Sequence, residues 1–443
     1  MIFSVRMLYN KRNGPPSGKG EGGKSGFEAR KGGKEKMKFV FSDGEKIGVY
    51  RDGNAEKSES AYIAHYRETA IRDSKNKEWK TQGHTAQLLA EGIYTNGEER
   101  VVAAIHGVSL TPDENRVLYA FTVNDSSGIY SKLTDDEKKT EMHIVSSNEA
   151  DFMSVACNGR GEMLAAVQTD PVTSRIAVFQ RDSGDYKCVT GGDSLDENPS
   201  FGADGKSVLF NSYGVGRDAN NNFVEYMPSE IYRLNLSTLD VEPVKSDPKL
   251  SYIKPVEDRD GNLYCIRKPG KEKTGGNLVV EILLIPVRII QAIAGFISSF
   301  VMCFTGKPLV SGQSSRSVDG GGGAAKNGRP NAGKAFINNN LLNVDRELKK
   351  NKKQEDYGFI PSSWKLVRLA KDGTEDVEIA SGVADFCLVE EDGKKTFVYT
   401  NGKHIFSVCE GEKRKKLADT DFCLKVGSLY SADSSDSELY DFF

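Results

Sequence analysis

The sequence of 443 residues has little cysteine and histidine, and neither residue is arranged for chemistry. Its seven cysteines are an odd number without close pairs, which excludes a disulfide framework and favours a reducing compartment. The five histidines show no metal-ligand spacing, and no G-x-S-x-G nucleophile motif is present. We therefore expect no cofactor, no metal and no catalytic residue. The sequence favours a non-enzymatic protein but does not exclude an enzyme.

The sequence also lacks an excess of one charge. It has 60 Lys and Arg against 63 Asp and Glu, which excludes a wholesale nucleic-acid-binding chain. The charges are unevenly placed, however. Residues 1–36 are rich in Gly and Lys and are predicted to be a disordered basic arm, and residues 431–443 are predicted to be an acidic tail. The apolar start is broken by Arg6 and is too short for a signal-peptide core, which favours the cytoplasm unless the start codon is misassigned.

A tight turn between two short apolar segments recurs along the chain. Asp-Gly turns supply the positive φ of two-residue hairpin loops, and runs of Val, Leu, Phe and Tyr suit strands. The copies are Phe41–Tyr50, Thr111–Ala120, Asn158–Val167, Pro199–Phe210, Asp258–Ile266 and Glu391–Tyr399. A second hairpin follows most copies, for example Ser229–Leu236 with Asp240–Val244. Each copy therefore predicts four antiparallel strands, the content of a propeller blade.

The spacing of the copies predicts one interruption. Successive turns are about 70, 47, 44, 56 and 132 residues apart, and the last interval falls to about 50 when residues 275–356, which lack a strand pattern, are removed. The sequence therefore predicts an all-β, six-bladed β-propeller of four-stranded antiparallel blades over residues 37–430. A helical, membrane-type insertion at 275–356 is expected between the second and third strands of the fifth blade. A β-sandwich of irregular hairpins is the alternative fold.

The fourth copy resembles the TolB-like six-bladed β-propeller family, whose WD40-like (PD40-type) blades carry P-x-[FW]-S-P-D-G-x-x-[IL]-x-[FY] followed by an I-Y-x-x-[DN]-L strand. Residues 199–210 follow the first pattern with Gly202-Ala203 in place of Ser-Pro and Val208 in place of Ile or Leu, and residues 231–236 follow the second. The other copies are more degenerate. The resemblance implies a fold and no activity, since the group includes both periplasmic interaction proteins and peptidase-associated propellers. This chain shows no clear export signal and no hydrolase domain.

Residues 277–304 are the longest apolar stretch, with Glu281 and Arg288 as its only charges. As a helix they would be about 42 Å long at ~1.5 Å per residue, enough to cross a ~30 Å hydrocarbon core. Both ends of the insertion return to one blade, and the polar residues that follow cannot cross lipid. The residues expected to contact a membrane are Ile282, Leu283, Ile285, Ile289, Ile290, Ile293, Phe296, Ile297, Phe300, Val301 and Phe304. The basic residues expected to flank it are Arg288, Lys307 and Arg316.

Three placements of this apolar helix stay open. It can lie in the membrane interface or dip into it, span the membrane, or pack on the propeller or on a second copy of the chain. Residues 305–340 are rich in Gly, Ser and Asn and predict a flexible tether. Residues 341–355 predict a short basic helix.

Several short motifs are better explained by structure than by ligand binding. Residues 18–23 match a dinucleotide fingerprint, but no strand precedes them and no helix pattern follows. Residues 328–334 match a phosphate loop, but Ala335 stands where a Ser or Thr must bind Mg²⁺, and Pro330 and the Gly-rich context also count against it. Residues 258–262 match the start of a calcium loop without its distal glutamate, and they coincide with a repeat turn. The alternation of Asp218, Asn220 and Asn222 leaves a weak cation site open.

These observations favour a membrane-associated, non-enzymatic propeller on the cytoplasmic side, acting as a scaffold or sensor for unknown protein partners and binding no specific nucleic acid. A propeller enzyme, or a small-ligand or metal binder using the mouth of the central channel, is one alternative. A module that self-associates through the apolar helix is the other.

Overall fold

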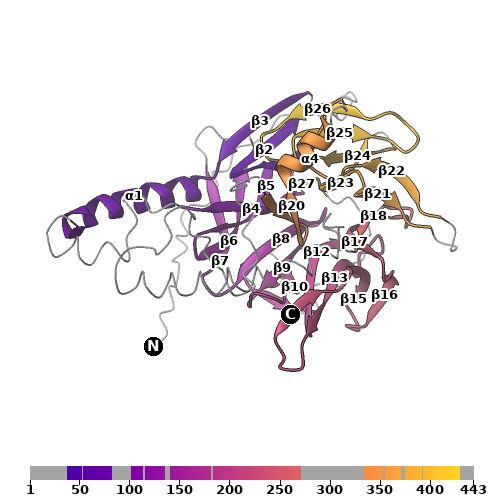
Figure 1. Ribbon diagram of the computed structural model, residues 1–443, viewed down its shortest axis with the longest axis horizontal. Helices are drawn as coiled ribbons and strands as arrows, with labels where there is room; N and C mark the ends of the chain where they lie inside the picture. Colours follow the sequence, from indigo (N-terminus) through magenta and orange to yellow (C-terminus); the bar gives the residue numbers. More distant parts are fainter. Residues whose placement is uncertain are drawn as a thin grey trace, which may run out of the picture. The chain divides into compact units, whose positions relative to one another are not determined.

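A computed structural model describes residues 37–429 with the exception of 52, 82–100, 113–114, 135–139, 181–182, 271–333, 353–354, 371–374 and 392. Over these residues the chain forms six blades, each with four antiparallel strands in sequence order apart from one strand that closes the ring, and one separate two-stranded sheet (Figure 1). The six-bladed propeller predicted from the repeated turns is therefore confirmed, and the β-sandwich is excluded.

Each blade has an innermost strand next to the ring axis and an outermost strand at the rim. From the innermost outward, blade one contains β27 (Val426–Gly427), β1 (Lys38–Asp43), β2 (Lys46–Arg51) and β3 (Asn54–Glu59). Blade two contains β4 (Ala103–Leu110), β5 (Arg116–Val123), β6 (Ser126–Leu133) and β7 (Glu141–Ser147). Blade three contains β8 (Asp151–Cys157), β9 (Met163–Gln168), β10 (Arg175–Phe179) and β11 (Tyr186–Cys188).

Blade four contains β12 (Ser194–Phe201), β13 (Ser207–Arg217), β15 (Glu230–Asn235) and β16 (Val241–Lys245). Its long strand β13 also pairs with β14 (Phe223–Tyr226). Blade five contains β17 (Leu250–Glu257), β18 (Leu263–Pro269), β21 (Lys365–Arg368) and β22 (Val377–Ser381). Blade six contains β23 (Asp385–Glu391), β24 (Lys394–Thr400), β25 (His404–Val408) and β26 (Lys415–Asp419).

The repeated turns join strands in the way that their chemistry predicts. Gly44, Gly205, Gly261 and Gly393 each take a positive φ between 63° and 74° in the turn of their copy, a conformation that glycine adopts without strain. At residues 258–262 the Asp258 carboxylate accepts the backbone N–H groups of Asp260 and Asn262 at 3.0 and 2.8 Å. This loop is therefore the turn between β17 and β18.

Apolar side chains join each blade to the next around the ring. Blades one and two share a cluster that includes Val40 and Phe121, and blades six and one share one that includes Phe39 and Val398. Three further clusters join blades two to three, three to four and four to five, and the largest spans blades four, five and six. Burying one such side chain stabilises the fold by roughly 1.5–3 kcal/mol. The contact between blades six and one shows that the ring is closed.

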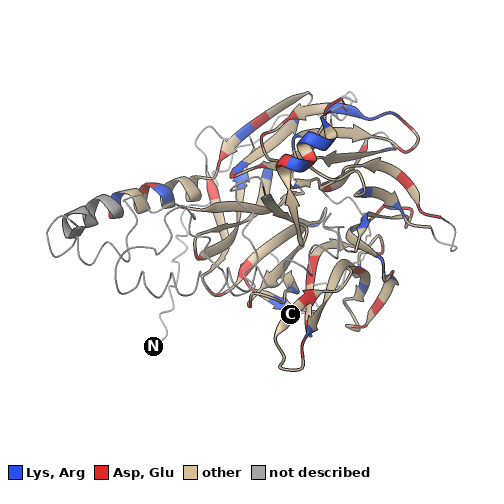
Figure 2. Cartoon of the chain, viewed as in Figure 1, with Lys and Arg blue, Asp and Glu red and all other residues tan. Residues whose placement is uncertain are grey.

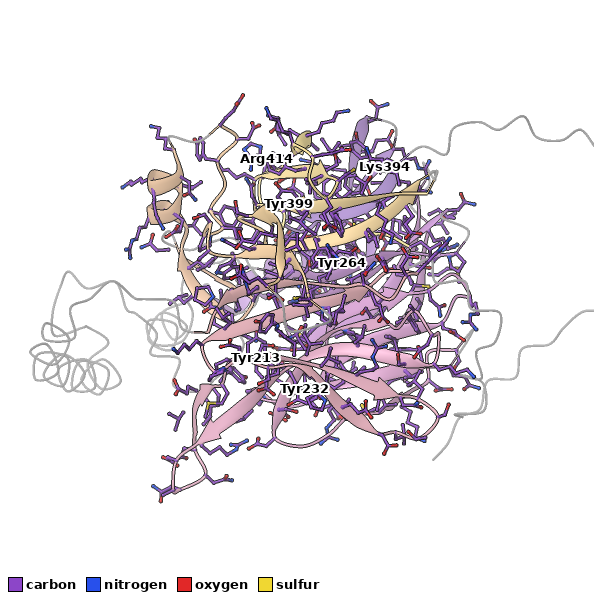
Figure 3. The ribbon with its side chains drawn as sticks, turned by 90° about the vertical axis from the view of Figure 1, so that its right-hand side faces the viewer. Tyr213, Tyr232, Tyr264, Lys394, Tyr399 and Arg414 are labelled. Atoms are coloured by element: carbon purple, nitrogen blue, oxygen red, sulfur yellow. The ribbon has the colours of Figure 1, made fainter. Side chains whose placement is uncertain are left out.

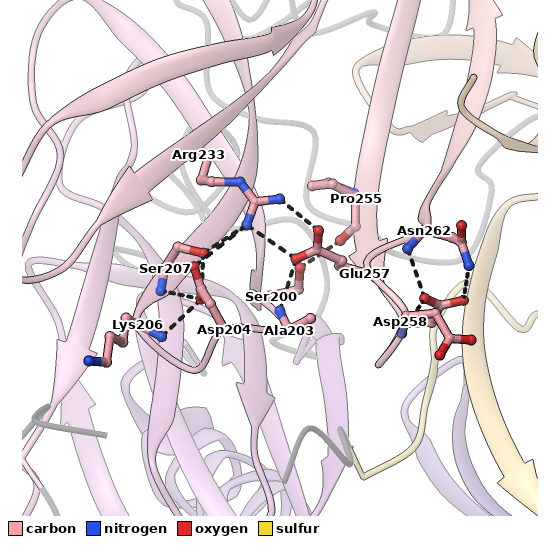
Figure 4. Close-up of polar contacts among 11 residues, drawn as sticks. Ser200, Ala203, Asp204, Lys206, Ser207, Arg233, Pro255, Glu257, Asp258 and Asn262 are labelled. Atoms are coloured by element: carbon pink, nitrogen blue, oxygen red, sulfur yellow. Dashed lines mark hydrogen bonds and ion pairs between the residues drawn. The ribbon is translucent and has the colours of Figure 1, made fainter. Parts of the chain in front are cut away.

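The two motif segments of blade four, residues 199–210 and 231–236, also form a contact with blade five (Figure 4). Asp204 accepts the backbone N–H groups of Lys206 and Ser207, both at 2.9 Å, and thereby fixes the turn. Arg233, from the second part of the motif, donates from its two terminal nitrogens to the Glu257 carboxylate at 3.1 and 2.8 Å. Such bidentate pairs are stronger and more directional than single hydrogen bonds. The motif residues therefore hold two blades together.

The ring closes through the end of the chain. Strand β27 pairs with β1 in the register Val40↔Gly427 and Phe41↔Val426, and so supplies the innermost strand of blade one. A Cβ atom built on Gly427 would collide with the carbonyl oxygen of Val108 in β4. Glycine is required here because the closing strand lies against the backbone of the next blade.

The fifth blade is interrupted between its second and third strands, since β18 pairs directly with β21. Part of the intervening chain is a hairpin of β19 (Lys334–Ile337) and β20 (Asn340–Asn343), followed by α4 (Val344–Asn351). The Asn343 side chain caps α4 by accepting the N–H of Arg346 at 2.9 Å. The expected basic helix at 341–355 was therefore wrong in its limits, and the expected tether at 305–340 was wrong from residue 334, where the buried Ala335 and Ile337 begin a strand.

Helix α1 (Ala61–Thr81) was not predicted; it lies within the interval of about 70 residues between the first two turns. It follows β3 and extends away from the sheets (Figure 1). The Glu141 carboxylate accepts the N–H groups of Ala61 and Tyr62 at 2.9 and 3.1 Å, a favourable place for a negative charge at a helix N-terminus.

The added elements lie at one end of the ring. We call the end at which the innermost strands begin the insertion face. Strand β18 ends there, since Pro269 pairs with Leu250 at the start of β17. Figure 3 shows α4 on one side of the molecule and Lys394, the first residue of β24, on the other, which we call the opposite face. Figure 2 shows both signs of charge spread over the blades, with Lys and Arg concentrated on α4.

The basic arm 1–36, the apolar helix 277–304 and the acidic tail 431–443 all lie outside the described residues. In the part of the chain that the structure does describe, no helix is both long enough and apolar enough to cross a membrane.

Candidate functional site

A central cavity runs between the blades and is the candidate functional site. All six innermost strands line it, together with residues just before and after β27. Its walls are partly apolar, through Val108, Val155, Val256, Phe386 and Leu388. A concave site with apolar walls and a few polar groups is the usual form of a ligand pocket.

Bulges in the innermost strands turn polar groups toward this cavity. Strands β4, β8, β12 and β17 each carry one. In β12 and β17 the bulges place Asn198 at φ 49° and Lys254 at φ 51°, a left-handed conformation that is unfavourable for residues other than glycine. The buried Asn211 supports both, because its Oδ1 accepts Asn198 Nδ2 at 2.9 Å and Lys254 N at 3.1 Å. Bulges of this kind re-aim side chains and are frequent beside functional sites.

An ion pair on the cavity wall joins three blades. Lys254 Nζ of blade five lies 2.5 Å from Oδ1 of Asp385 in blade six, and also donates to the carbonyl of Val426 in blade one at 3.1 Å. The second Asp385 oxygen accepts the N–H of Val426 at 2.8 Å. Both Asp385 oxygens are therefore occupied, and the pair also holds the closing strand.

A second lysine in the cavity has a different environment. Lys425 is half-buried, and its backbone pairs with Ser42 of β1. No described carboxylate lies within ion-pairing distance of its ammonium group. Burial, and then the charge of Lys254, lower the pKa of Lys425 more than Asp385 and Glu197 raise it. Lys425 is thus a poorly neutralised cation that faces the cavity.

The hairpin β19–β20 lies at the insertion-face end of this site. Its turn residue Asn339 donates to Glu197 of β12 at 3.4 Å, while Asn338 donates to the carbonyl of Ala384, just before β23, at 2.9 Å. Asn338 in turn accepts a hydrogen bond from Lys268 of β18. Burial raises the pKa of Glu197, against the opposing effects of Lys425 and Lys268. The hairpin therefore contacts blades four, five and six where their innermost strands begin.

Charged groups near the other end of the cavity are paired within the wall. Glu257 binds Arg233, and Asp258 accepts Lys395 at 2.7 Å. Arg259 lies 3.3 Å from Glu390. Among the described residues, the charged groups that line this end of the cavity are therefore paired, unlike Lys425 at the insertion-face end.

The cysteines of the cavity wall are buried. Cys157 and Cys387 both line it, and burial raises the pKa of Cys387 to about 12. A thiol with so high a pKa is a poor nucleophile. Within the described ranges, no group of three His, Cys, Asp or Glu side chains is arranged to hold a metal ion.

Sequence reasoning did not single out the cavity residues. The eleven apolar residues expected at a membrane, and the flanking Arg288, Lys307 and Arg316, all lie outside the described residues, so the structure does not place them. Lys254 and Asn198 had a local signal, because each precedes a proline within an otherwise strand-like segment. Lys425 had none, since only ring closure brings it to the axis.

Comparison with known proteins gives structural likeness without sequence likeness. No protein-family model and no curated protein matches the chain. TolB from Acinetobacter baumannii has a similar structure at 9% identity and a TM-score of 0.39, over 88% of this chain and 66% of that chain. The tricorn protease has 11% identity and a TM-score of 0.39, over 88% of this chain and 34% of that chain. A puromycin-hydrolyzing peptidase from Mycobacterium tuberculosis has 9% identity and a TM-score of 0.39, over 87% of this chain and 44% of that chain.

The chain spans less than two thirds of the length of each of these proteins. At such identities and TM-scores the likenesses support no conclusion about activity or partners. The architecture is instead established by the pairing of the chain's own strands. With six four-stranded antiparallel blades, the chain is a six-bladed β-propeller.

Proposed function

We propose that this chain is a membrane-associated scaffold that binds a protein partner through the opposite face of its propeller. In this proposal the insertion of blade five contacts the cytoplasmic side of a membrane through residues 277–304. The propeller supplies a rigid surface, and the chemistry carried out is binding and not catalysis.

The proposal is based on the position of the insertion, which begins and ends on the insertion face of the propeller. Strand β18 ends at Pro269 before the insertion, and strand β19 begins at Lys334 within it. The Lys268 side chain, just before this gap, donates to the carbonyl of Asn338 in the turn between β19 and β20, so the chain on both sides of the gap lies at the insertion face. An apolar segment held in this way can approach a membrane while the other face of the ring stays accessible.

Exposed charges on α4 also support a membrane contact. Arg346, Lys349, Lys350 and Lys352 are exposed near the end of the insertion, against the exposed Asp345 and the half-buried Glu347. A basic residue near an anionic membrane surface contributes about 1 kcal/mol. These residues add to the basic flank that Arg288, Lys307 and Arg316 give the apolar stretch in sequence.

Vesicle flotation tests the membrane contact. The full chain is mixed with vesicles of phosphatidylcholine and phosphatidylserine and centrifuged through a density gradient. We expect the full chain to float with the vesicles, and a variant with residues 271–333 replaced by a short Gly/Ser linker to stay at the bottom. The double substitution of Val224→Ser and Met227→Ser is the matched control. It removes two exposed apolar side chains, one in β14 and one just after it, and leaves the insertion unchanged.

The proposal fails if the full chain does not float while its thermal unfolding shows that it is folded. Loss of flotation in high salt would assign the contact to the basic residues, and resistance to alkaline extraction would assign it to the apolar helix. A concentration-dependent mass without vesicles, abolished by the same deletion, would instead make the insertion a self-association device.

A further inference from the structure

We propose that the insertion-face end of the central cavity is a binding site for a carboxylate group, with the Lys425 ammonium as its cation. This inference is independent of the membrane contact. It starts from a comparison of the polar groups that line the cavity, because only those not already bonded within the wall can bind a ligand.

Neutral polar side chains of the cavity wall form hydrogen bonds to other residues of the propeller. Ser200 donates to the carbonyl of Pro255 at 2.7 Å, and Ser428 donates to the carbonyl of Leu388 at 2.7 Å. Ser154 accepts the N–H of Ala166 at 3.3 Å, and Asn198 donates to Asn211. These groups hold the strands in place.

The described charged side chains of the cavity wall also form ion pairs within the propeller, with the exception of Lys425. Lys254 and Asp385 neutralise each other, and the acids nearer the opposite face have their own cations. Lys425 faces the same space without a carboxylate at ion-pairing distance among the described residues. Glu197 attracts it from blade four, but this acid is bound to Asn339 of the hairpin and is shared with Lys268. When Lys425 is protonated, the site therefore has an excess of one positive charge.

The surroundings of Lys425 select the kind of anion. A phosphate dianion would need several free donors, whereas the ammonium group is the one uncommitted cation among the described lining residues. A monoanion is the matching charge. Because the walls also contain Val108, Val155, Val256 and Phe386, the group attached to the anion is expected to be small and uncharged. A carboxylate on a short aliphatic chain or at the end of a peptide satisfies both conditions.

Bound carboxylate would also relieve a physical cost at this lysine. Burial makes the charged form of Lys425 less favourable than in water, and an anion at hydrogen-bonding distance reverses this effect. Binding is therefore expected to raise the pKa of Lys425 and to take up protons from solution. Calorimetry in buffers with different ionisation enthalpies measures this uptake directly.

The test uses the full-length chain and two matched pairs of probes. Butyrate is compared with butyramide, and acetyl-trialanine with a free carboxylate is compared with its C-terminal amide. We expect each acid to bind at least about tenfold more tightly than its amide, which is the effect of losing one charge-assisted contact. The butyrate pair reports a small-molecule ligand, and a preference for the peptide acid over butyrate identifies a peptide terminus as the source of the carboxylate.

Three substitutions locate the site. Lys425→Met, which keeps an unbranched side chain but removes the ammonium group, should abolish the preference for acid over amide, while Lys425→Arg should retain it. Glu197→Gln removes the competing acid and should tighten acid binding severalfold. Lys415→Met, an exposed lysine of β26, is the control and should change nothing.

The proposal is overturned if neither acid binds better than its amide to the folded full-length chain, or if Lys425→Met keeps the preference. Thermal unfolding of each variant shows that it is folded before binding is measured. Because flotation is scored separately, failure of this site leaves the membrane proposal untouched, and the reverse also holds.

Discussion

Blade one and blade four have the same four-stranded form but are held together by different means. Blade four is continuous in sequence from β12 to β16, and its turn is fixed by Asp204 within the motif. Blade one takes its innermost strand from the other end of the chain, and that strand pairs with β1 at two positions. Polar side chains of other blades supply the missing support, since Asp385 and Lys254 both bond to Val426.

The difference shows how a ring is closed by a short strand. Two backbone pairs cannot by themselves balance the entropy of joining the ends of a long chain. The buried Asp43 adds to the closure by accepting the N–H groups of Asp421 and Phe422 at 2.9 and 2.7 Å, and its carboxylate lies 2.5 Å from Lys57. Blade one should therefore be sensitive to charges that are distant in sequence, and blade four to its own motif.

The largest expected effect comes from Asp385→Asn. The substitution leaves Lys254 without its counter-ion and weakens the contact to Val426, so we expect the free energy of unfolding to fall by about 3 kcal/mol. Urea unfolding measures the loss, and amide hydrogen exchange should show it first in β27 and β1. The control is Asp240→Asn, an exposed acid of blade four. Equal losses in the two variants would show that Asp385 does not hold the closing strand.

A smaller effect is expected from Arg233→Lys in blade four. Lysine keeps the charge but cannot make the two-nitrogen contact to Glu257, so we expect a loss of about 1 kcal/mol. A double-mutant cycle that combines Arg233→Lys with Glu257→Gln isolates the pair, because Arg233→Lys should cost less stability when position 257 is already glutamine. If the cycle shows no coupling in the original chain, the motif arginine does not join the two blades.

The smallest effect is a change in pH dependence at Asp258. Although burial alone would raise its pKa, hydrogen bonds from Lys395 and Asn262 hold the pKa of Asp258 below its usual value. A depressed carboxyl pKa contributes stability above the unfolded-state pKa, and this stability is lost as the pH falls through the folded-state pKa. We therefore expect Asp258→Asn to be less stable than the original chain at neutral pH.

The same variant should lose less stability than the original chain when the pH is lowered from about 5 toward 3. Urea unfolding at a series of pH values measures the two slopes. Asp260→Asn is a useful comparison, because its carboxylate also contacts Lys395 but is exposed, so a smaller change is expected. Parallel curves for Asp258→Asn and the original chain would contradict the assigned role of this carboxylate.

Local chemistry made much of the fold predictable. The glycines at 44, 205, 261 and 393 mark turns that any hairpin of this shape requires, and the apolar segments beside them can only be strands. The hairpin β19–β20 was missed because its turn is formed by Asn338 and Asn339, both with positive φ, in a stretch whose Gly and Asn content predicted a tether. In this hairpin the burial of Ala335 and Ile337 against the propeller decides the structure.

The sequence by itself therefore determined the blades, because hairpin turns and alternating apolar strands depend on residues that are neighbours in the chain. Only the tertiary structure decided the site. Lys425, Lys254 and Asp385 lie in three different blades, and nothing local in the sequence relates them. Their effects on one another exist because closing the ring removes them from water and brings them to one axis, where each charge depends on the others for compensation.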